Sequence, residues 1–222
     1  MTGNKLPGVD AIFFDCDGVL LDSVHVKEEQ FRALMEERIP RHVDAAMEYY
    51  WANGGTSRLA KFRHIWKEIV KAPLSEDDVS AQGAEFAARV FKGVVDCPML
   101  PGAREFLERH CPDLPAYVIS GTPDPELKRV IEVRGLTKFF RGVHGSPRNK
   151  TEIGGELLKA GGYRPERVFF LGDATTDRDA AVNLGLKFIG IDGPHLTPFL
   201  TGGEIVIKDL RLLEAVLARA GR

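Results

Sequence analysis

A short apolar run that ends on two closely spaced acids is the feature that most constrains this chain. Residues 11–14 are apolar and are followed by Asp15, Cys16, Asp17 and Gly18. A run this short, rich in aromatic side chains and bounded by turn residues, is typical of a buried strand. Side chains two positions apart on an extended segment point the same way, so both acids are expected to face one spot. Ligands of open α/β sheets bind at the carboxyl ends of the strands, which predicts a site here.

Two carboxylates held this close repel one another unless a proton or a metal ion lies between them. An oxygen-preferring divalent cation such as Mg²⁺ fits, and one acid can then act as nucleophile while the other moves a proton. The Asp-x-Asp-Gly pattern also occurs in calcium loops and ordinary turns. An EF-hand loop is disfavoured because it needs a third oxygen ligand two residues further on, where the chain has Val19.

Composition indicates an ordinary globular protein of 222 residues, long enough for one large domain or for a core with an inserted one. The net charge of −2 argues against a nucleic acid or a membrane surface as partner. The three cysteines, Cys16, Cys97 and Cys111, are scattered and odd in number. This favours a reducing cytoplasm and argues against a disulfide framework or a zinc site. The polar residues 1–9 do not resemble a signal peptide, and no apolar run approaches membrane-spanning length.

Strand and helix patterns alternate along most of the chain, which predicts an α/β fold with a doubly wound parallel sheet. The predicted strands are 11–14, 116–120, 142–145, 167–171, 187–191 and 204–207. Between the first two strands, helical periodicity predicts helices at about 24–38, 42–51, 57–70 and 75–97. About 100 residues separate the strand ends at Asp15 and Ser120, and one crossover helix needs far fewer. We therefore expect residues 1–22 and 98–222 to form the core, with 23–97 as an inserted helical domain.

Polar groups follow several of the predicted strands and would converge at one edge of a parallel sheet. Each has a task in phosphoryl transfer. Asp15 is expected to attack phosphorus and form an aspartyl-phosphate. Asp17 is expected to protonate the leaving oxygen and then to take a proton from the attacking water. For that role the pKa of Asp17 should be raised by the negative charge of Asp15 and of the bound phosphate.

The remaining members of this group would bind phosphate and metal. Ser120 and the backbone N–H of Gly121 are expected to bind non-bridging phosphate oxygens, and Lys150 to offset the charge between Asp15 and the phosphate. Asp173 would complete the magnesium shell. Asp177 would orient Lys150 or a metal-bound water. Ser120, Lys150 and Asp177 each also have a simpler structural explanation, as a turn residue, a solvated lysine and a helix N-cap.

These motifs resemble those of the haloacid-dehalogenase-like superfamily, in its phosphoglycolate-phosphatase and β-phosphoglucomutase-like branch. Residues 15–23, 118–122, Lys150, and Gly172–Asp173 with Asp177 are similar to its four motifs in order and spacing. The resemblance implies a Rossmann-like core and a type-1 helical cap over the site. It also implies Mg²⁺, held by Asp15, Asp173 and the backbone carbonyl of Asp17. The implied function is magnesium-dependent hydrolysis of a small soluble phosphomonoester by a cytoplasmic monomer or homodimer.

Other activities stay open at this point. A sugar-phosphate mutase would return phosphate to the substrate, but Ser120-Gly121 at the second motif favours hydrolysis. A phosphonate hydrolase would need a cap lysine that forms a Schiff base, for which Lys27 and Lys61 are available. A dehalogenase is disfavoured because that activity lacks the second acid, here Asp17. A non-catalytic binding protein that keeps the fold is a further alternative, against which the intact set of acids argues.

Substrate selection should come from the helical domain, because the core motifs handle only the phosphoryl group. The glycine pair Gly54-Gly55 allows close backbone approach to a ligand, and Arg58 and Lys61 follow at the start of a helix. Arg58 could bind an anionic or hydroxyl-rich end of the substrate with its paired N–H groups. The alternative is an ordinary helix start with solvated basic residues.

Overall fold

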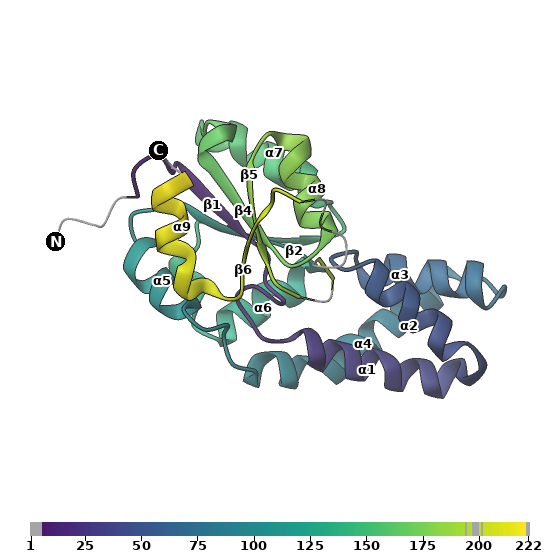
Figure 1. The fold of residues 1–222 in the computed structure, drawn as a ribbon. Helices are drawn as coiled ribbons and strands as arrows, with labels where there is room; N and C mark the ends of the chain where they lie inside the picture. Colours follow the sequence, from purple (N-terminus) through teal and green to yellow (C-terminus); the bar gives the residue numbers. More distant parts are fainter. Residues whose placement is uncertain (1–5, 194, 197–199, 201, 221–222) are drawn as a thin grey trace.

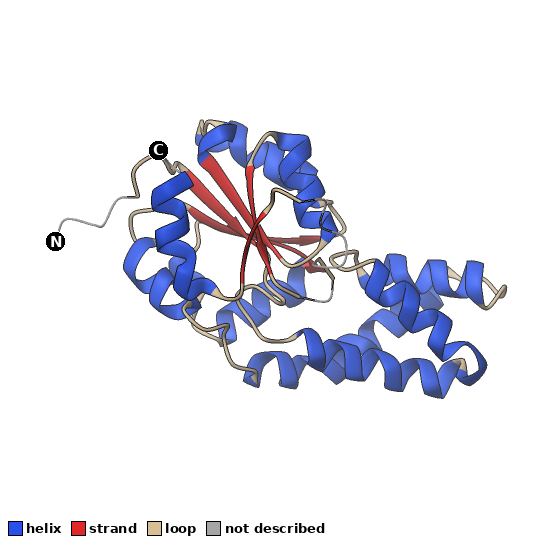
Figure 2. Cartoon of the chain, viewed as in Figure 1, coloured by secondary structure: helices blue, strands red, loops and turns tan. Residues whose placement is uncertain are grey.

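The fold is built on one six-stranded sheet. The computed structural model of the protein describes residues 6–193, 195–196, 200 and 202–220. The strands are β1 (Ala11–Phe14), β2 (Ala116–Pro123), β3 (Gly142–Ser146), β4 (Val168–Gly172), β5 (Lys187–Ile191) and β6 (Ile205–Ile207). They pair in the order β3-β2-β1-β4-β5-β6, and every pair is parallel (Figure 2). The order reverses direction next to β1, and the prediction of a doubly wound parallel sheet is confirmed.

Helices cover both faces of the sheet (Figure 1). One face packs on α7 (Lys150–Gly161) and α8 (Thr175–Leu184), and the other on α5 (Ala103–His110), α6 (Asp124–Val133) and α9 (Leu213–Ala220). Both faces of the sheet are buried under helices, so every residue of β1 is apolar, and apolar and polar residues do not alternate along it. Its side chains still divide between the faces. Phe13 meets Phe170 edge-on at 6.1 Å between ring centroids on the α7 side, and Phe14 meets Phe106 at 6.1 Å on the other.

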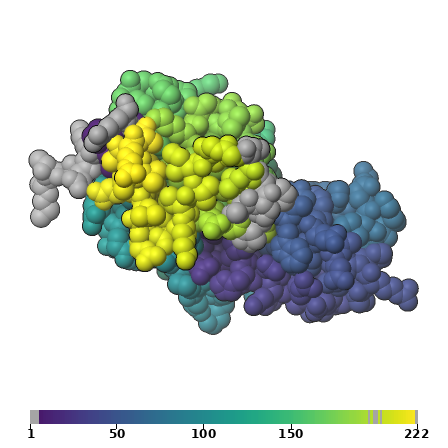
Figure 3. Space-filling model, viewed as in Figure 1, coloured from purple at the N-terminus to yellow at the C-terminus, as the bar shows by residue number. Residues whose placement is uncertain are grey.

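Between β1 and α5, the chain forms a helical segment, residues 24–96, that lies to one side of the sheet (Figures 1 and 3). Its helices are α1 (Val24–Arg38), α2 (Val43–Ala52), α3 (Arg58–His64) and α4 (Glu76–Asp96). One helix was expected over 57–70, but the structure has α3 followed by a π-helical turn, Ile65–Ile69. Short 3₁₀ turns occur at Pro40–His42, Thr137–Phe139, Pro165–Arg167 and Leu210–Leu212.

Polar side chains cap the N-termini of several of these helices. Ser57 accepts the backbone N–H of Ala60 at the start of α3, and Ser75 accepts that of Asp78 at the start of α4. At the start of α7, Asn149 and Glu152 form a capping box in which each side chain accepts the other's backbone N–H. This cap fixes the first turn of α7, which carries Lys150.

The interior of the helical segment is aromatic. The rings of Phe31 and Phe62 stack at 5.7 Å, and Phe86 meets both of them edge-on at 5.9 and 6.3 Å. Phe31 and Phe62 are fully buried. Each of the helices α1, α3 and α4 contributes one of these rings, so the cluster joins three separate helices. None of the helices in the described residues is both long and apolar enough to cross a membrane.

The strand predicted to end at Ser120 is too short, since β2 continues to Pro123. The pairing of β2 with β3 shifts register between Ile119 and Pro123, and Pro123 then pairs with Ser146. Glycine and proline mark strand ends in sequence patterns, but here they continue the extended backbone across a bulge. The extension carries Gly121 and Thr122 over the carboxyl edge of β1.

We predict that Phe62→Ala lowers the free energy of unfolding by about 3–5 kcal/mol, because it removes a fully buried ring and leaves a cavity among three aromatic neighbours. Urea denaturation followed by circular dichroism measures this change. Val133→Ala on α6 is the control, since Val133 is 56% exposed, and should change the free energy by no more than about 0.5 kcal/mol. Equal effects of the two substitutions would contradict the proposed packing.

Candidate active site

Asp15 follows the last residue of β1 and lies at the centre of the site. It is 4% exposed, and its backbone N–H donates to the carbonyl of Leu171 at 2.9 Å, which continues the sheet pairing one step past the strand. Its carboxylate accepts the N–H of Cys16 at 2.7 Å and lies 3.0 Å from the ammonium of Lys150. The sheet therefore fixes the position of this carboxylate, and Lys150 places a positive charge beside it.

Lys150 bridges two buried acids. Its Nζ lies 2.5 Å from Oδ1 of Asp177 and 3.0 Å from Oδ2 of Asp15, and all three side chains are nearly inaccessible. Burial alone would lower the pKa of Lys150, but the two carboxylates raise it well above its usual value. Lys150 is thus a permanent cation. Asp177 also accepts the N–H of Ala174 at 3.2 Å, so it is held at the start of α8.

Three buried carboxylates gather beside this lysine. Oxygen atoms of Asp15, Asp173 and Asp177 lie within 4.8 Å of one another. Burial, and then the negative charges of Asp15 and Asp177, raise the pKa of Asp173 well above its usual value. Burial likewise raises the pKa of Asp177 to about 7, although Lys150 opposes the shift. One ammonium does not neutralise three acids, so the donor set fits a divalent cation that prefers oxygen ligands.

A glycine makes room for this cluster. Gly18 has a φ of +75°, and a Cβ atom there would lie 2.2 Å from Oδ2 of Asp173. Asp173 can therefore approach the turn after β1 only because position 18 has no side chain. The expected metal ligands were the carboxylates of Asp15 and Asp173 and the backbone carbonyl of Asp17. The cluster adds a nearby carboxylate oxygen of Asp177.

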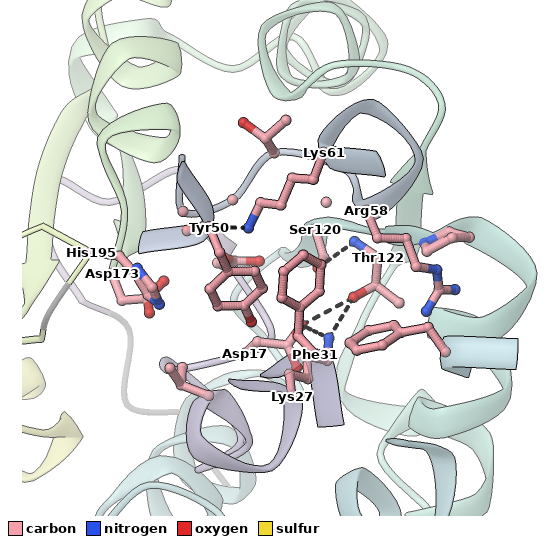
Figure 4. Close-up of a pocket in the computed structure, with 18 residues that line it drawn as sticks. Asp17, Lys27, Phe31, Tyr50, Arg58, Lys61, Ser120, Thr122, Asp173 and His195 are labelled. Atoms are coloured by element: carbon pink, nitrogen blue, oxygen red, sulfur yellow. Dashed lines mark hydrogen bonds and ion pairs between the residues drawn. The ribbon is translucent and has the colours of Figure 1, made fainter. Parts of the chain in front are cut away.

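The carboxylate of Asp17 is held by three donors away from the acid cluster (Figure 4). It accepts from the hydroxyl of Ser23 at 2.6 Å, the ammonium of Lys27 at 2.5 Å and the hydroxyl of Thr122 at 3.0 Å. Burial raises the pKa of Asp17, but Lys27 and these hydrogen bonds outweigh burial and lower it. The expectation of a raised pKa is therefore wrong for the protein without substrate, because sequence reasoning did not include Lys27.

Ser120 and Gly121 lie on the extension of β2 next to this group. Ser120 is 3% exposed, and its hydroxyl accepts the N–H of Thr122 at 3.2 Å. A Cβ atom on Gly121 would lie 2.3 Å from the carbonyl oxygen of Gly55 in the loop between α2 and α3. The helical segment thus reaches the sheet edge at this glycine. Thr176 adds a second link by donating to the carbonyl of Gly54 at 3.3 Å.

These groups line a pocket between the sheet edge and the helical segment (Figure 4). The empty space between its lining atoms, open mouth included, is about 690 Å³. The helical segment contributes Lys27, Arg58 and Lys61, and also the apolar rings of Phe31 and Phe86. The predicted catalytic, phosphate-binding and selectivity residues Asp15, Asp17, Ser120, Gly121, Asp173, Arg58 and Lys61 all line it, while Lys150 and Asp177 lie behind Asp15.

The two basic residues expected to select the substrate differ in their surroundings. Arg58 directs both terminal nitrogens at the carboxylate of Glu126 on α6, and both side chains are nearly buried. Lys61 is 6% exposed and donates to the backbone carbonyl of Tyr50 at 3.3 Å, with the Tyr50 ring 3.9 Å from its nitrogen. Burial first, and then the charge of Lys27, lower the pKa of Lys61 to about 7, and Asp173 opposes this shift.

Several residues that line the pocket or contact its lining were not singled out as site residues by the sequence. Thr122 and Glu126 belong to β2 and α6, and Tyr50 was expected to be bundle core. His195 follows β5, is 6% exposed, and lies 3.1 Å from the carbonyl of Trp51 through Nδ1. Lys27 was considered only as a Schiff-base lysine. Thr122, Glu126 and His195 lie 105, 68 and 144 positions from their partners Asp17, Arg58 and Trp51. Lys27 and Tyr50 lie 10 and 11 positions from Asp17 and Lys61 but on a different element, so no local pattern indicates these pairings.

The sheet, its buried acid cluster and the pocket above its carboxyl edge define an α/β enzyme that handles an anionic substrate beside a divalent metal. The family model of haloacid dehalogenase-like hydrolases matches residues 9–185, and the chain belongs to this family. The family assignment and the acid cluster agree with metal-dependent hydrolysis of a phosphoester.

Several relatives and solved structures are similar to this chain. The phosphoglycolate phosphatases of Escherichia coli K12 and Pseudomonas putida KT2440 are each 25% identical to this chain, over 85% and 91% of it and 83% and 77% of their own lengths. A β-phosphoglucomutase from Clostridium difficile superposes with a TM-score of 0.78 at 18% identity, covering 96% of this chain and 97% of its own. A haloacid dehalogenase-like protein from Streptococcus pneumoniae superposes at 0.71 with 22% identity, covering 94% and 99%. At these identities the two structures support the fold alone.

We predict that Mg²⁺ stabilises the protein more at pH 8 than at pH 6. The raised pKa values of Asp173 and Asp177 mean that protons compete with the metal at the lower pH. Thermal unfolding with Mg²⁺ and with a chelator at each pH measures the difference. Asp173→Asn should weaken Mg²⁺ binding by at least about tenfold, whereas Asp179→Asn, an exposed acid on α8, should not. A metal effect independent of both pH and Asp173 would contradict this site.

Proposed function

We propose that the protein is a magnesium-dependent phosphatase that hydrolyses a small phosphomonoester through an aspartyl-phosphate on Asp15. The observation that carries this proposal is the position of Asp15. It is buried at the end of the central strand, 3.0 Å from the ammonium of Lys150, and open to a pocket lined by hydroxyl and N–H donors. A carboxylate that lies beside an ammonium and lines a polar pocket is suited to attack an electrophile.

The metal is proposed to be Mg²⁺, because the donors are all hard carboxylate oxygens. Asp15 and Asp173 would hold it, together with the backbone carbonyl of Asp17. When bound, the ion would neutralise charge on the phosphoryl group and on the acids around it.

The residues of this chain divide the chemistry between them. The Asp15 carboxylate attacks phosphorus, and the ester oxygen leaves with a proton from Asp17. Water then attacks the acyl phosphate, Asp17 takes its proton, and inorganic phosphate and free Asp15 result. The hydroxyl of Ser120 and the N–H of Gly121 bind phosphate oxygens. Lys150, oriented by Asp177, offsets the repulsion between the negative charges of Asp15 and the phosphate.

Asp17 has to change partners for this role. In the structure, Lys27 and Thr122 both contact its Oδ2 atom and favour the ionised form. Substrate phosphate would compete for Lys27 and would bring negative charge close to Asp17. Both effects raise the pKa of Asp17 toward the protonated form that a general acid requires.

We assign residues 1–22 and 98–222 to a catalytic core and residues 23–97 to a cap that closes over the site. The pocket lies between these two parts, which supports the division. Because the curated relatives are phosphoglycolate phosphatases, 2-phosphoglycolate is the first substrate to test. Three free, buried cysteines support a cytoplasmic location. A small-molecule ester is the proposed partner, and monomer or homodimer stays a prediction.

Asp15→Asn should lower turnover by at least about a thousandfold while phosphate binding and folding are kept, because the amide preserves shape but cannot attack. Release of inorganic phosphate from 2-phosphoglycolate with Mg²⁺ measures turnover, and calorimetry measures binding. Asp22→Asn, at an exposed acid in the same loop, serves as control. Turnover by Asp15→Asn at the wild-type rate would exclude Asp15 as nucleophile.

Asp17→Asn should slow alkyl phosphates at least about tenfold more than an activated aryl phosphate, because only a poor leaving group needs the proton. Single-turnover rates on 2-phosphoglycolate and 4-nitrophenyl phosphate give the comparison. Asp22→Asn, at an exposed acid of the same loop, is the control and should affect the two esters alike. Equal losses on both esters in Asp17→Asn would exclude the general-acid role.

A further inference from the structure

The basic side chains of the site are not equivalent, since most already have a carboxylate of the protein as partner. Lys150 pairs with Asp15 and Asp177, Lys27 pairs with Asp17, and Arg58 pairs with Glu126. Lys61 is the exception: within the described residues it forms no ion pair. The residues outside that set include no aspartate or glutamate, so they supply no side-chain carboxylate either.

Lys61 is also held in a position from which it can bind a ligand. It lines the pocket, and Figure 4 shows its ammonium on the pocket side of Tyr50. One N–H donates to the carbonyl of Tyr50, and the Tyr50 ring lies under the nitrogen. An ammonium has three N–H donors. A buried ammonium without a counter-ion is unfavourable, and an anion entering the pocket would relieve this cost.

Arg58, the other basic residue that faces the pocket from α3, is less suited to this task. Both of its terminal nitrogens point at Glu126, an arrangement that uses the paired face of the guanidinium and neutralises its charge. Among the described residues, the Nε of Arg58 has no hydrogen-bond partner, so it could donate one hydrogen bond to a ligand. A ligand anion would nevertheless meet the Glu126 carboxylate beside it.

We propose that Lys61, rather than Arg58, selects the substrate by binding an anionic group on the leaving part of the ester. This rests on the proposed phosphatase function and narrows its substrate class to phosphomonoesters with a second anion. A carboxylate and a second phosphate share this chemistry. Arg58 and Glu126 instead hold the helical segment against α6.

The lowered pKa of Lys61 adds a pH dependence. Tyr50 from α2, Lys27 from α1, Asp173 after β4 and His195 after β5 are the titratable groups that face it. With a pKa of about 7 in the free protein, Lys61 is charged below that pH and neutral above it. An anion binds the charged form, so its advantage over a neutral analogue should fall by up to about tenfold for each pH unit above 7.

The experiment measures ligand binding in Asp15→Asn, which should bind without turnover, by calorimetry with Mg²⁺ present. The probes are 2-phosphoglycolate and its carboxamide, which differ in one charge. A second pair, 1,3-propanediol bisphosphate and 3-hydroxypropyl phosphate, distinguishes a second phosphate from a carboxylate. We expect the anionic member of at least one pair to bind at least about tenfold more tightly at pH 6.5, and the ratio to fall as the pH rises to 9.

Adding Lys61→Met should remove the preference with less than about a threefold change in the affinity for the neutral member. Lys67→Met, which removes an exposed lysine from the same segment, should leave the preference intact. Lys61→Gln serves if the methionine variant does not fold. Three results would each overturn the proposal: equal affinity within both pairs, no pH dependence of the ratio, or a preference that survives loss of Lys61. The proposal would also be overturned if Asp15→Asn bound none of the four probes.

Turnover by the wild-type protein separates this proposal from the proposed function. If the wild-type protein hydrolyses both members of a pair equally well and Asp15→Asn binds them equally, the phosphatase assignment stands and the role of Lys61 falls. If the wild-type protein hydrolyses no phosphomonoester but the binding preference depends on Lys61, selection by Lys61 stands and the phosphatase assignment falls.

Discussion

The concentration of negative charge at the end of β1 is the constraint on which the rest of the site depends. Asp15, Asp173 and Asp177 are buried, with carboxylate oxygens within 4.8 Å of one another, and within the described part of the chain the cation that pairs with two of them, Asp15 and Asp177, is Lys150. Such a cluster is stable only if other elements supply the missing positive charge or position the acids so that a cation can enter. The capped first turn of α7 holds Lys150, the start of α8 holds Asp177, and Gly18 leaves space for Asp173. The catalytic potential of Asp15 therefore depends on three segments that are distant in sequence: the turn after β1, the start of α7 and the junction of β4 with α8.

Charge is arranged differently on the pocket side. Lys27 holds Asp17 in its ionised form, and Glu126 neutralises Arg58, so two of the charged groups that face the ligand are paired within the protein. Both pairs have one member on the helical segment and one on the core. The position of the segment and the charge state of the pocket are for this reason linked. Any movement that separates the two parts would expose Asp17 and Arg58 to new partners at the same time.

The sequence predicted the parts of the structure that local patterns determine. The β1 strand, the order of alternating elements, and the placement of Asp15, Ser120, Lys150 and Asp173 near strand or helix ends all follow from short runs of residues and from the resemblance. What it missed depends on contacts across the fold. The orientation of Asp17 is set by Lys27 on α1 and by Thr122 on β2. Glu126, the partner of Arg58, is 68 positions away in the sequence. The π-helical turn after α3 was missed because its apolar residues fit an uninterrupted α-helix equally well.

The contact between Gly121 and the carbonyl oxygen of Gly55 bears on how modular this architecture is. A single β-carbon at position 121 would lie 2.3 Å from that oxygen, and one at Gly54 would lie 2.6 Å from Cβ of His195. The loop of the helical segment therefore packs so closely against the core that neither Gly121 nor Gly54 has room for a β-carbon. The two parts are not interchangeable units. A helical segment grafted from a relative would pack on this core only if its loop also had glycines at the contact positions. The loop of the segment and the edge of the sheet therefore have to be exchanged, or varied, together.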